Sequence, residues 1–232
     1  MIPVLTIDGP SGSGKGTVAR EVAARLGWHL LDSGALYRLV GLAADQAGVS
    51  FKDGPGLAGV ASELAARFGQ TETGEEQIWL AGEDVTAAIR TERGGELASL
   101  VAAHPEVRDA LVDLQRGYRA PPGLVADGRD MGTVIFPDAD VKVYLTASAE
   151  ERAERRHKQL KEKGIGVSLT ALSREIAERD ARDANRSVAP LRAADDAYVV
   201  DSTNLSVDAV VAEVLRIAAE RWETLRQSAE PQ

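Results

Sequence analysis

The 232-residue chain contains no cysteine, and it has only three histidines. The missing cysteine excludes disulfides, thiolate nucleophiles and cysteine-based metal sites. His29, His104 and His157 lack the spacing of metal ligands, so we interpret them as structural residues. No apolar run approaches the roughly 20 residues that cross a bilayer, and no charged and apolar leader precedes the first strand-like run. We therefore expect a cytoplasmic protein with no membrane partner.

Positive charge is also scarce. The chain has 27 Lys and Arg against 36 Asp and Glu, a formal net charge of -9. This negative net charge disfavours sequence-independent binding to nucleic acid, so we expect no nucleic-acid partner. The length suits one sizeable core with a small insert. We expect a monomer with a single domain over residues 1–226 and a frayed tail over 227–232.

The stretch Gly9–Thr17, GPSGSGKGT, is the most informative motif. It follows the strand-like run Val4–Ile7 and precedes the helical pattern Val18–Leu26. Glycines allow successive backbone N–H groups to turn toward phosphate oxygens, and Lys15 adds a positive charge near the β- and γ-phosphates. This context predicts a phosphate-binding loop at a helix N-terminus. The loop residues expected to bind ATP are Gly9, Pro10, Ser11, Gly12, Ser13, Gly14, Lys15, Gly16 and Thr17.

The loop departs from the common pattern at one position. Gly16 follows Lys15, and the hydroxyl comes one residue later, at Thr17. The common form places Ser or Thr directly after the lysine to bind Mg²⁺. The Gly-Lys-Gly-Thr ending is similar to that of nucleoside monophosphate kinases rather than GTPases or motor ATPases. Three roles stay open for Thr17: a direct Mg²⁺ ligand, a ligand through water, or mainly a phosphate contact.

Short apolar runs alternate with longer helical patterns, which predicts an α/β fold with a parallel sheet and helices on both faces. The predicted strands are Val4–Asp8, Trp28–Leu31, Leu124–Ala126, Val141–Leu145 and Tyr198–Val200. The predicted helices are Lys15–Leu26 ended by Gly27, Ala35–Ala47, one from Ala149 with Ser148 and Glu151 as a capping box, and Val207–Arg226. A loop rich in Gly and Pro is expected at Asp53–Gly56.

The segment Phe68–Arg90 departs from the alternation of strands and helices. It contains the strand-like run Gln77–Leu80, the turn-like Ala81–Asp84 and then Val85. This pattern predicts a small antiparallel hairpin inserted into the α/β fold. The insert could be decorative, or it could form a mobile flap over a second substrate.

The cluster Asp32–Arg38 follows a predicted strand, at the edge where open α/β sheets bind ligands. Asp32 or Ser33 could simply cap the following helix. Tyr37 and Arg38 lie about one turn inside that helix, close enough to the sheet edge to meet a phosphate. The planar guanidinium of Arg suits phosphate oxygens, although Arg38 could also be a solvated surface residue.

The cluster Asp127–Thr133 follows the predicted strand Leu124–Ala126. It could be a turn with surface ion pairs. In the functional interpretation, Arg129 contacts a phosphate and Asp130 accepts a hydrogen bond from a donor such as a base amino group. An ionised Asp only accepts hydrogen bonds, so it favours an amino-bearing base edge.

Glu150–Arg192 is the most cation-rich part of the chain. Most of its charges suit two solvated helices with i,i+4 ion pairs. Arg179, Asp183 and Arg186, however, recur at helical spacing on one face, and the glycine-flanked connection Gly164–Gly166 joins the two helices. These features predict a lid, because phosphoryl transfer needs arginines near the transferred group and closure against water.

Four motifs together resemble the bacterial cytidylate kinases, over nearly the whole chain: Gly9–Thr17, Asp32–Arg38, Ala126–Thr133 and Glu178–Leu191. The resemblance implies an α/β P-loop three-layer sandwich with a parallel central sheet. It adds a small β-containing monophosphate-binding insert at about 57–100 and a helical lid at about 150–187. It also implies a nucleoside monophosphate kinase of pyrimidine nucleotide metabolism that transfers the ATP γ-phosphoryl group directly to CMP or dCMP, with Mg²⁺ as cofactor.

The resemblance further implies which residues bind CMP. Ser99, Arg108 and Asp130 would read the cytosine edge, and Ser33 and Tyr37 would line the monophosphate pocket. Ser99 and Arg108 carry no signal of their own and would otherwise be ordinary helix residues.

The same resemblance assigns the phosphates and the sugar. The acceptor phosphate would be held by Arg38, Arg129 and Arg186, and the sugar would be met by Arg179 and Asp183. The implied catalytic residues are Lys15, Arg129 and Arg186. The resemblance does not assign the lid arginines on the donor side, for which Arg155 and Arg156 are the candidates.

The sequence also allows three alternative functions to be considered. The nearest alternative is a P-loop kinase for UMP, AMP or a small metabolite such as shikimate. A GTPase switch or a motor ATPase is disfavoured, because neither Asn185 nor Asn204 is followed by the Lys of an Asn-Lys-x-Asp signature, and neither Asp-bearing strand end offers an Asp-Glu pair. A catalytically silent nucleotide sensor is a third class, which only an assay separates.

Overall fold

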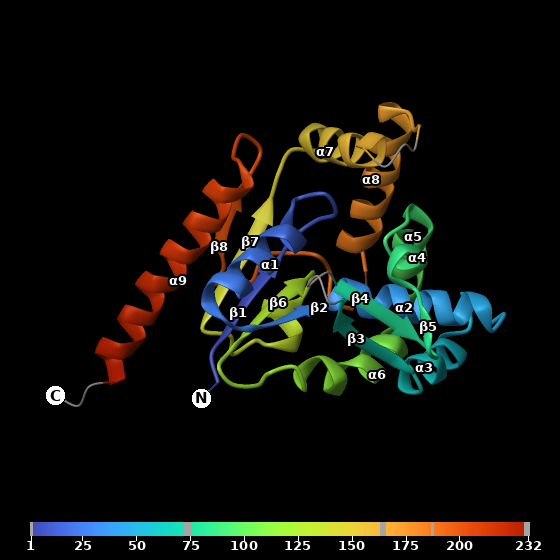
Figure 1. The fold of residues 1–232 in the computed structure, drawn as a ribbon, viewed down its shortest axis with the longest axis horizontal. Helices are drawn as coiled ribbons and strands as arrows, with labels where there is room; N and C mark the ends of the chain where they lie inside the picture. Colours follow the sequence, from blue (N-terminus) through green and yellow to red (C-terminus); the bar gives the residue numbers. More distant parts are fainter. Residues whose placement is uncertain (1, 72–75, 163–165, 187, 230–232) are drawn as a thin grey trace. The chain divides into compact units, whose positions relative to one another are not determined.

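The computed structural model of the chain describes residues 2–71, 76–162, 166–186 and 188–229 and divides into two compact units (Figure 1). The first unit contains Met1–Asp32 and Arg116–Gln232, and the second contains Ser33–Gln115. Parts of four predicted segments lie outside the described residues: 72–75 of the hairpin segment, Gly164 and Ile165 of the lid connection, Ser187 at the lid end and the last three residues of the tail.

The first unit contains a parallel five-stranded sheet with the order β2-β6-β1-β7-β8. Its strands are β1 (Val4–Asp8), β2 (His29–Asp32), β6 (Leu124–Gly128), β7 (Val141–Thr146) and β8 (Tyr198–Asp201). The sheet confirms the predicted α/β class and all five predicted strands, within one or two residues at the ends. From β1 the chain builds first one side of the sheet and then the other, so the carboxyl end of β1 is the topological switch point where such sheets bind ligands.

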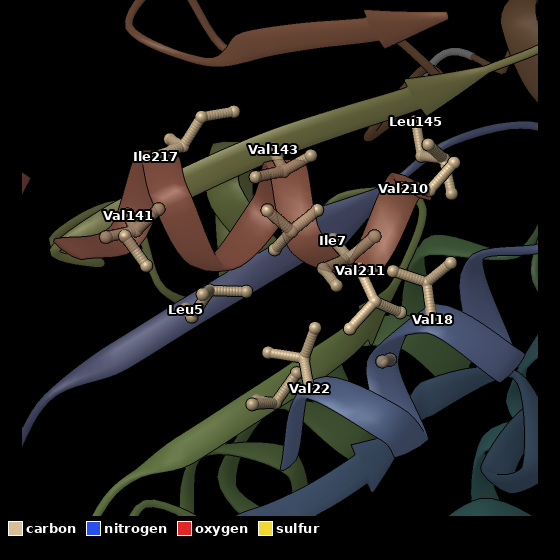
Figure 2. Packing of buried hydrophobic residues seen from close by; sticks show 14 of the residues in the cluster. Leu5, Ile7, Val18, Val22, Val141, Val143, Leu145, Val210, Val211 and Ile217 are labelled. Carbon is tan, nitrogen blue, oxygen red and sulfur yellow. The ribbon is translucent and has the colours of Figure 1, made fainter. Parts of the chain in front are cut away.

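Two helices pack on this sheet through an apolar cluster (Figure 2). Helix α1 (Lys15–Leu26) contributes Val18 and Val22, and the terminal helix α9 (Val207–Ala229) contributes Val211. Each of these side chains is at most 2% exposed, and burying one stabilises the fold by about 1.5–3 kcal/mol. The cluster fixes the start of α1, and therefore the loop before it, against the sheet.

Helix α1 has the predicted bounds, and Gly27 ends it with a left-handed φ of 66°. Helix α9 runs past the predicted end at Arg226 to Ala229. Within the described part of the chain, no helix combines the length and the apolar character needed to cross a membrane.

Helices α7 (Ala149–Glu162) and α8 (Leu169–Ala184) form the cation-rich part of the first unit. Ser148 caps α7 as predicted, because its Oγ accepts the N–H of Glu151 at 3.1 Å. The second bond of the predicted capping box is absent, because the N–H of Ser148 donates to Thr203 Oγ1 at 3.0 Å and the Glu151 carboxylate pairs with Arg155. One prediction here is wrong. Helix α8 ends at Ala184, so Arg186 does not share a helical face with Arg179. Arg186 lies beyond the last residue of the helix, and its Nε donates to the carbonyl of Asp183 at 3.2 Å.

The second unit combines helices with a small antiparallel sheet of order β3-β4-β5. Its strands are β3 (Ala66–Gln70), β4 (Glu76–Leu80) and β5 (Glu83–Asp84). The predicted hairpin is β4 and β5, joined at Ala81 and Gly82, which both adopt positive φ. The third strand, β3, was not predicted, because its sequence Ala-Arg-Phe-Gly-Gln lacks a clear alternation.

The helices of the second unit are α2 (Ser33–Gln46), α3 (Gly54–Ser62), α4 (Thr86–Ile89), α5 (Glu92–Val101) and α6 (Pro105–Arg116), of which α6 ends with a residue of the first unit. The loop predicted at Asp53–Gly56 is wrong, because α3 begins there. Asp53 accepts the N–H of Gly56 at 3.0 Å as an N-cap, and Pro55 suits the first helical turn.

Candidate active site

The loop after β1 has the backbone that phosphate binding requires. Gly12 and Gly14 adopt left-handed φ of 79° and 87°. Gly9 lies against β7, where an added Cβ would come within 2.0 Å of the Leu145 carbonyl oxygen. Gly14 is the N-cap of α1 and has no side chain with which to cap it. The first N–H groups of α1 therefore point out of a helix N-terminus that favours an anion.

Lys15 lies at the start of α1, beside other charged groups of the first unit. Its Nζ donates to the carbonyl of Pro10 at 3.1 Å. Removal from water and then the charge of Arg129 lower the pKa of Lys15 to about 7, while Asp127 acts in the opposite direction. A polyphosphate at this loop would favour the charged amine, because an opposite charge stabilises the ammonium form.

The segment after β6 and the end of α8 meet in a buried ion pair. Arg129 Nε donates to Asp183 Oδ2 at 2.7 Å, and Asp183 is 4% exposed. Burial tends to raise the pKa of Asp183, but the charge and hydrogen bond of Arg129, helped by Arg186 and Arg179, hold it below its usual value. Burial likewise opposes the charge of Arg129, and Asp183 nevertheless raises the pKa of that guanidinium. The predicted residues Arg129, Arg179, Asp183 and Arg186 therefore form one cluster.

This cluster lies close to the loop. Arg129 and Arg179 both act electrostatically on Lys15, and Arg179 Nη1 donates to the hydroxyl of Ser11 at 3.4 Å. The structure thus brings the predicted donor-phosphate cradle together with four predicted acceptor residues, all within the first unit.

Helix α7 also contacts the phosphate loop, through Arg152. Its Nη1 donates to the carbonyl of Ser11 at 3.1 Å and pairs with Asp180 Oδ2 of α8 at 2.6 Å. An added Cβ at Gly12 would lie 3.0 Å from Arg152 Cβ, so helix and loop pack closely. Arg152 has no sequence signal that separates it from its charged neighbours, because only the fold shows which arginine of α7 faces the loop.

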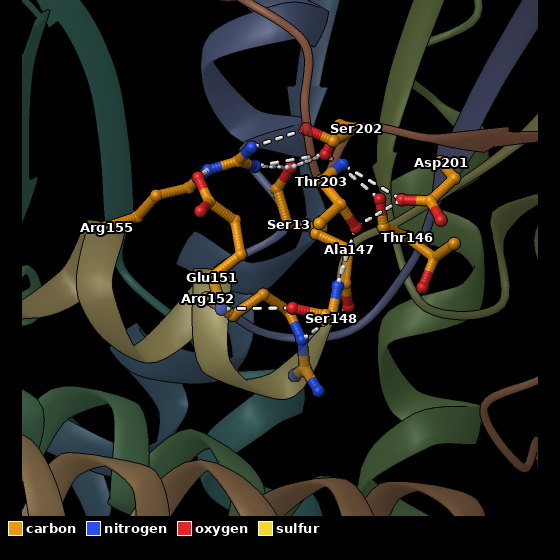
Figure 3. Close-up of polar contacts among 10 residues, drawn as sticks. All are labelled: Ser13, Thr146, Ala147, Ser148, Glu151, Arg152, Arg155, Asp201, Ser202 and Thr203. Atoms are coloured by element: carbon orange, nitrogen blue, oxygen red, sulfur yellow. Dashed lines mark hydrogen bonds and ion pairs between the residues drawn. The ribbon is translucent and has the colours of Figure 1, made fainter.

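Arg155 links the loop to the end of β8 (Figure 3). Its Nη1 donates to the carbonyl of Ser13 at 3.3 Å and to Ser202 Oγ at 3.0 Å, and its Nε pairs with Glu151 at 2.7 Å. Arg156 Nη1 instead donates to Gln159 Oε1 at 3.2 Å on the surface of α7. Of the two arginines considered for the donor side, Arg155 is the one in contact with the loop.

A short π-helix, η1 (Met131–Ile135), follows the Arg129–Asp130 pair. The carboxylate of Asp8 accepts the N–H groups of Met131 and Gly132, each at 2.8 Å. Burial raises the pKa of Asp8 to about 7, although both backbone hydrogen bonds lower it. No role for Asp8 was predicted from the sequence. Its only signal was a carboxylate at the end of a buried strand, directly before Gly9.

The second unit places Tyr37 of α2 and Arg108 of α6 together. The guanidinium carbon of Arg108 lies 5.4 Å from the centre of the Tyr37 ring, within the range of a cation–π contact. Arg108 is 5% exposed, and its Nη1 donates to the carbonyl of Ala102 at 3.3 Å. These contacts offset part of the cost of burying the guanidinium, because a buried charge is costly unless it has partners.

The other predicted residues of the second unit are also held by polar contacts or burial. Ser33 Oγ donates to Gln115 Oε1 at 2.8 Å, and Arg38 Nη1 donates to the carbonyl of Ile89 at 2.6 Å. Ser99 of α5 is 5% exposed. The sequence motifs found Ser33 and Arg38, whereas only the family resemblance pointed to Ser99.

Two side chains near Lys15 carry oxygens that could hold Mg²⁺. Within the described ranges, no group of three or more His, Cys, Asp or Glu is placed to hold a metal. Mg²⁺ bound with a nucleotide needs fewer, because phosphates and water supply most of its ligands. Thr17 is exposed on α1, and Asp127 at the end of β6 is buried with Oδ2 only 3.2 Å from an added Cβ at Gly16. A hydroxyl and one carboxylate fit such a metal.

The histidines contact backbone carbonyls. His29 Nε2 lies 2.9 Å from the Pro121 oxygen, and His104 Nε2 lies 2.9 Å from the Phe51 oxygen. These contacts agree with structural roles for both residues.

A family model described as cytidylate kinase matches residues 5–220 of the chain. A protein named cytidylate kinase from Methylococcus capsulatus is 62% identical over 210 residues, covering 90% of this chain and 94% of its own. Cytidylate kinases from Cupriavidus pinatubonensis and Aeromonas salmonicida are 57% and 55% identical, covering 93% and 95% of this chain and 95% and 96% of their own.

Among solved structures, a gluconokinase from Sinorhizobium meliloti 1021 aligns with a TM-score of 0.51 and 15% identity, covering 98% of each chain. At this identity the likeness concerns the fold alone. It agrees with the P-loop kinase architecture of the parallel sheet.

Proposed function

This chain belongs to the cytidylate kinase family, and we propose that it phosphorylates CMP and dCMP by direct transfer of the γ-phosphoryl group of ATP. It is an ATP-dependent phosphotransferase whose products are ADP and CDP or dCDP. The observation that carries the mechanism is the buried Arg129–Asp183 pair beside Lys15 and the phosphate loop. The proposal includes a monomer acting in the cytoplasm.

On the donor side, the loop Gly9–Thr17 binds the ATP phosphates through its backbone N–H groups and Lys15. The N-terminus of α1 adds a partial positive charge. Thr17 and Asp127 would hold Mg²⁺ together with the phosphates, and the bound metal would neutralise developing negative charge.

On the acceptor side, Arg38, Arg129 and Arg186 hold the phosphate of CMP, and Arg179 and Asp183 meet its sugar. The second pKa of a phosphate is about 6, so the acceptor oxygen is already ionised at neutral pH and no general base is needed. Catalysis is then positioning and charge neutralisation by Lys15, Arg129 and Arg186. Asp183 supports this role, because it keeps Arg129 charged and oriented before the substrate arrives.

Base recognition is assigned to Ser99, Arg108 and Asp130, with Ser33 and Tyr37 lining the pocket for the monophosphate. A cytosine edge offers an amino donor beside acceptors. A carboxylate and a guanidinium match this pattern, because the first only accepts and the second only donates. The burial of Asp130 and Arg108 supports the assignment, since their hydrogen bonds to a base would be shielded from water.

The Asp130→Ala variant should lose base preference. With the carboxylate gone, the cytosine amino group loses its acceptor, while UMP loses nothing. The ratio of kcat/KM for CMP to that for UMP should fall about tenfold or more, as expected for one hydrogen bond to a charged group. Steady-state kinetics with both acceptors measure this ratio. A ratio equal to that of the wild type would remove Asp130 from base recognition.

The Arg155→Met variant should weaken ATP binding without unfolding the protein. Methionine keeps much of the apolar stem but loses the hydrogen bonds to Ser13 and Ser202 that link the loop to β8. We expect the KM for ATP to rise about fivefold to tenfold, while the KM for CMP changes less than twofold. Arg174→Met is the matched control, because Arg174 pairs with Glu178 on the exposed face of α8. An unchanged KM for ATP in Arg155→Met would contradict the role of this link.

The direct-transfer proposal is tested with ATP labelled in its γ-phosphate. After one turnover with CMP, the label should lie in the β-phosphate of CDP, and no label should stay on the protein in the absence of CMP. A labelled protein intermediate would contradict direct transfer. Label released only as inorganic phosphate would contradict the kinase function itself.

A further inference from the structure

Asp8 links the phosphate loop to the segment proposed to recognise CMP. It is the last residue of β1, and Gly9 of the loop follows it directly. Asp8 is 5% exposed, and each of its two carboxylate oxygens accepts a different N–H group. Oδ1 accepts the N–H of Met131 and Oδ2 accepts the N–H of Gly132, each at 2.8 Å. A single carboxylate therefore binds the first two N–H groups of η1, which no earlier turn of the helix can bind.

This work is usually done by the side chain of the N-cap residue. Asp130 occupies the N-cap of η1 and is a residue type that caps well, yet within the described residues its own side chain makes no capping hydrogen bond. The cap comes instead from Asp8, which lies at the end of β1, more than 120 positions earlier in the sequence. The arrangement separates two tasks, because the carboxylate that caps the helix is not the one assigned to the base.

Asp8 holds the Arg129–Asp130 pair from both sides. Its backbone pairs with Gly128 in the β1–β6 ladder, and its carboxylate accepts the N–H of Met131, three residues after Gly128. The only residues between these two anchors are Arg129 and Asp130. One residue therefore fixes both the start and the end of the segment that carries them.

The packing around these anchors leaves little room for a shift. An added Cβ at Gly128 would lie 2.8 Å from Met131 Cγ, and one at Gly132 would lie 2.9 Å from Thr6 Oγ1. The backbone of η1 thus rests directly on β1. Loss of an acceptor oxygen at Asp8 would leave a buried N–H group unpaired, and the segment would have to move to regain a partner.

We propose that Asp8 is a positioning residue that sets the Arg129–Asp130 pair in register with the phosphate loop, and so tunes the recognition of CMP. The inference rests on the proposed function, because it assumes that Arg129 and Asp130 meet CMP. Asp8 itself touches neither substrate in this role. It acts through the backbone of Met131 and Gly132.

The test is the Asp8→Asn variant, which keeps the size of the side chain but replaces one acceptor oxygen by a donor that faces an N–H group. We expect the ratio of kcat/KM for CMP to that for UMP to fall about tenfold, mainly through a higher KM for CMP. The KM for ATP should change less than twofold. Hydrogen exchange of the peptide that covers residues 129–136 should become faster.

The matched control is Asp140→Asn. Asp140 Oδ2 accepts the N–H of Val4 at 2.8 Å, the same kind of bond at the opposite end of β1. This variant should weaken the hydrogen bond that anchors the start of β1 but keep the CMP preference and the exchange rate of residues 129–136. Equal losses of preference in both variants would overturn the inference in favour of a purely structural role.

The outcomes also separate this inference from the proposed function. If the wild type does not phosphorylate CMP, the proposed function fails, and the exchange experiment still decides whether Asp8 holds the segment. If the wild type is active on CMP and Asp8→Asn keeps both the preference and the exchange rate, the positioning role is overturned. If Asp8→Asn does not fold, Asp8→Glu, which keeps both oxygens but moves them by one methylene, is measured in the same way. An unchanged preference and exchange rate in that variant would likewise overturn the role.

Discussion

Replacing Lys15 with alanine is expected to lower kcat for CMP phosphorylation about a thousandfold. The amine is the only side-chain cation of the loop Gly9–Thr17, and its contact with Pro10 holds it at the N-terminus of α1. Charge at this position counters the negative charge that develops during transfer, and removing one such group costs about 10²–10³ in rate or more. The loss should appear in kcat rather than only in the KM for ATP.

The fold of this variant should stay intact, because the change removes a partly desolvated charge rather than a packed apolar group. Circular dichroism and the thermal midpoint check this point. Lys52→Ala is a suitable control, since Lys52 is an exposed residue of the second unit. Full activity in Lys15→Ala would remove Lys15 from the catalytic set.

Replacing Arg129 with lysine is expected to lower kcat/KM for CMP about a hundredfold. Lysine keeps the positive charge but loses the planar fork that can bind a phosphate and a carboxylate in fixed geometry. Arg129 is hydrogen-bonded to Asp183, so the change also loosens the group that sets its direction. Kinetics with varied CMP at saturating ATP measure the effect, and the KM for ATP serves as the internal reference.

The alanine variant of Arg129 reports on stability instead. It would leave Asp183 buried without its ion-pair partner, which typically costs about 3–5 kcal/mol. We therefore expect Arg129→Ala to lower the free energy of unfolding strongly, and Asp183→Asn combined with it to restore part of the loss. Urea unfolding of the single and double variants measures this.

For the lysine variant, normal kinetics would contradict the assignment of Arg129 to the acceptor phosphate.

The sequence predicted what depends on neighbours in the chain. The strands around β1, the bounds of α1, the glycine at its end and the Ser148 cap of α7 all follow from local patterns, and the structure confirms them. Arg186 shows the limit of such patterns, because helical spacing continues in the sequence after the helix itself has ended.

Contacts between distant residues could not be predicted in this way. Arg152 reaches the carbonyl of Ser11 and Asp8 caps η1, each across more than 100 residues. Neither has a spacing that a single sequence can show, since both depend on how the strands are ordered in the sheet. Ser99 and Arg108 are similar cases, because only a family resemblance set them apart from other helix residues.

CMP phosphorylation is tested most directly by ADP production from ATP and Mg²⁺ with each of CMP, dCMP, UMP, AMP, GMP, dTMP and shikimate as acceptor. We expect CMP and dCMP to be clearly preferred over the other five. Activity with only another acceptor would contradict the assignments of Ser99, Arg108 and Asp130 while leaving the phosphate loop in place. No activity with any acceptor, from folded protein, would contradict the kinase function and favour a nucleotide sensor.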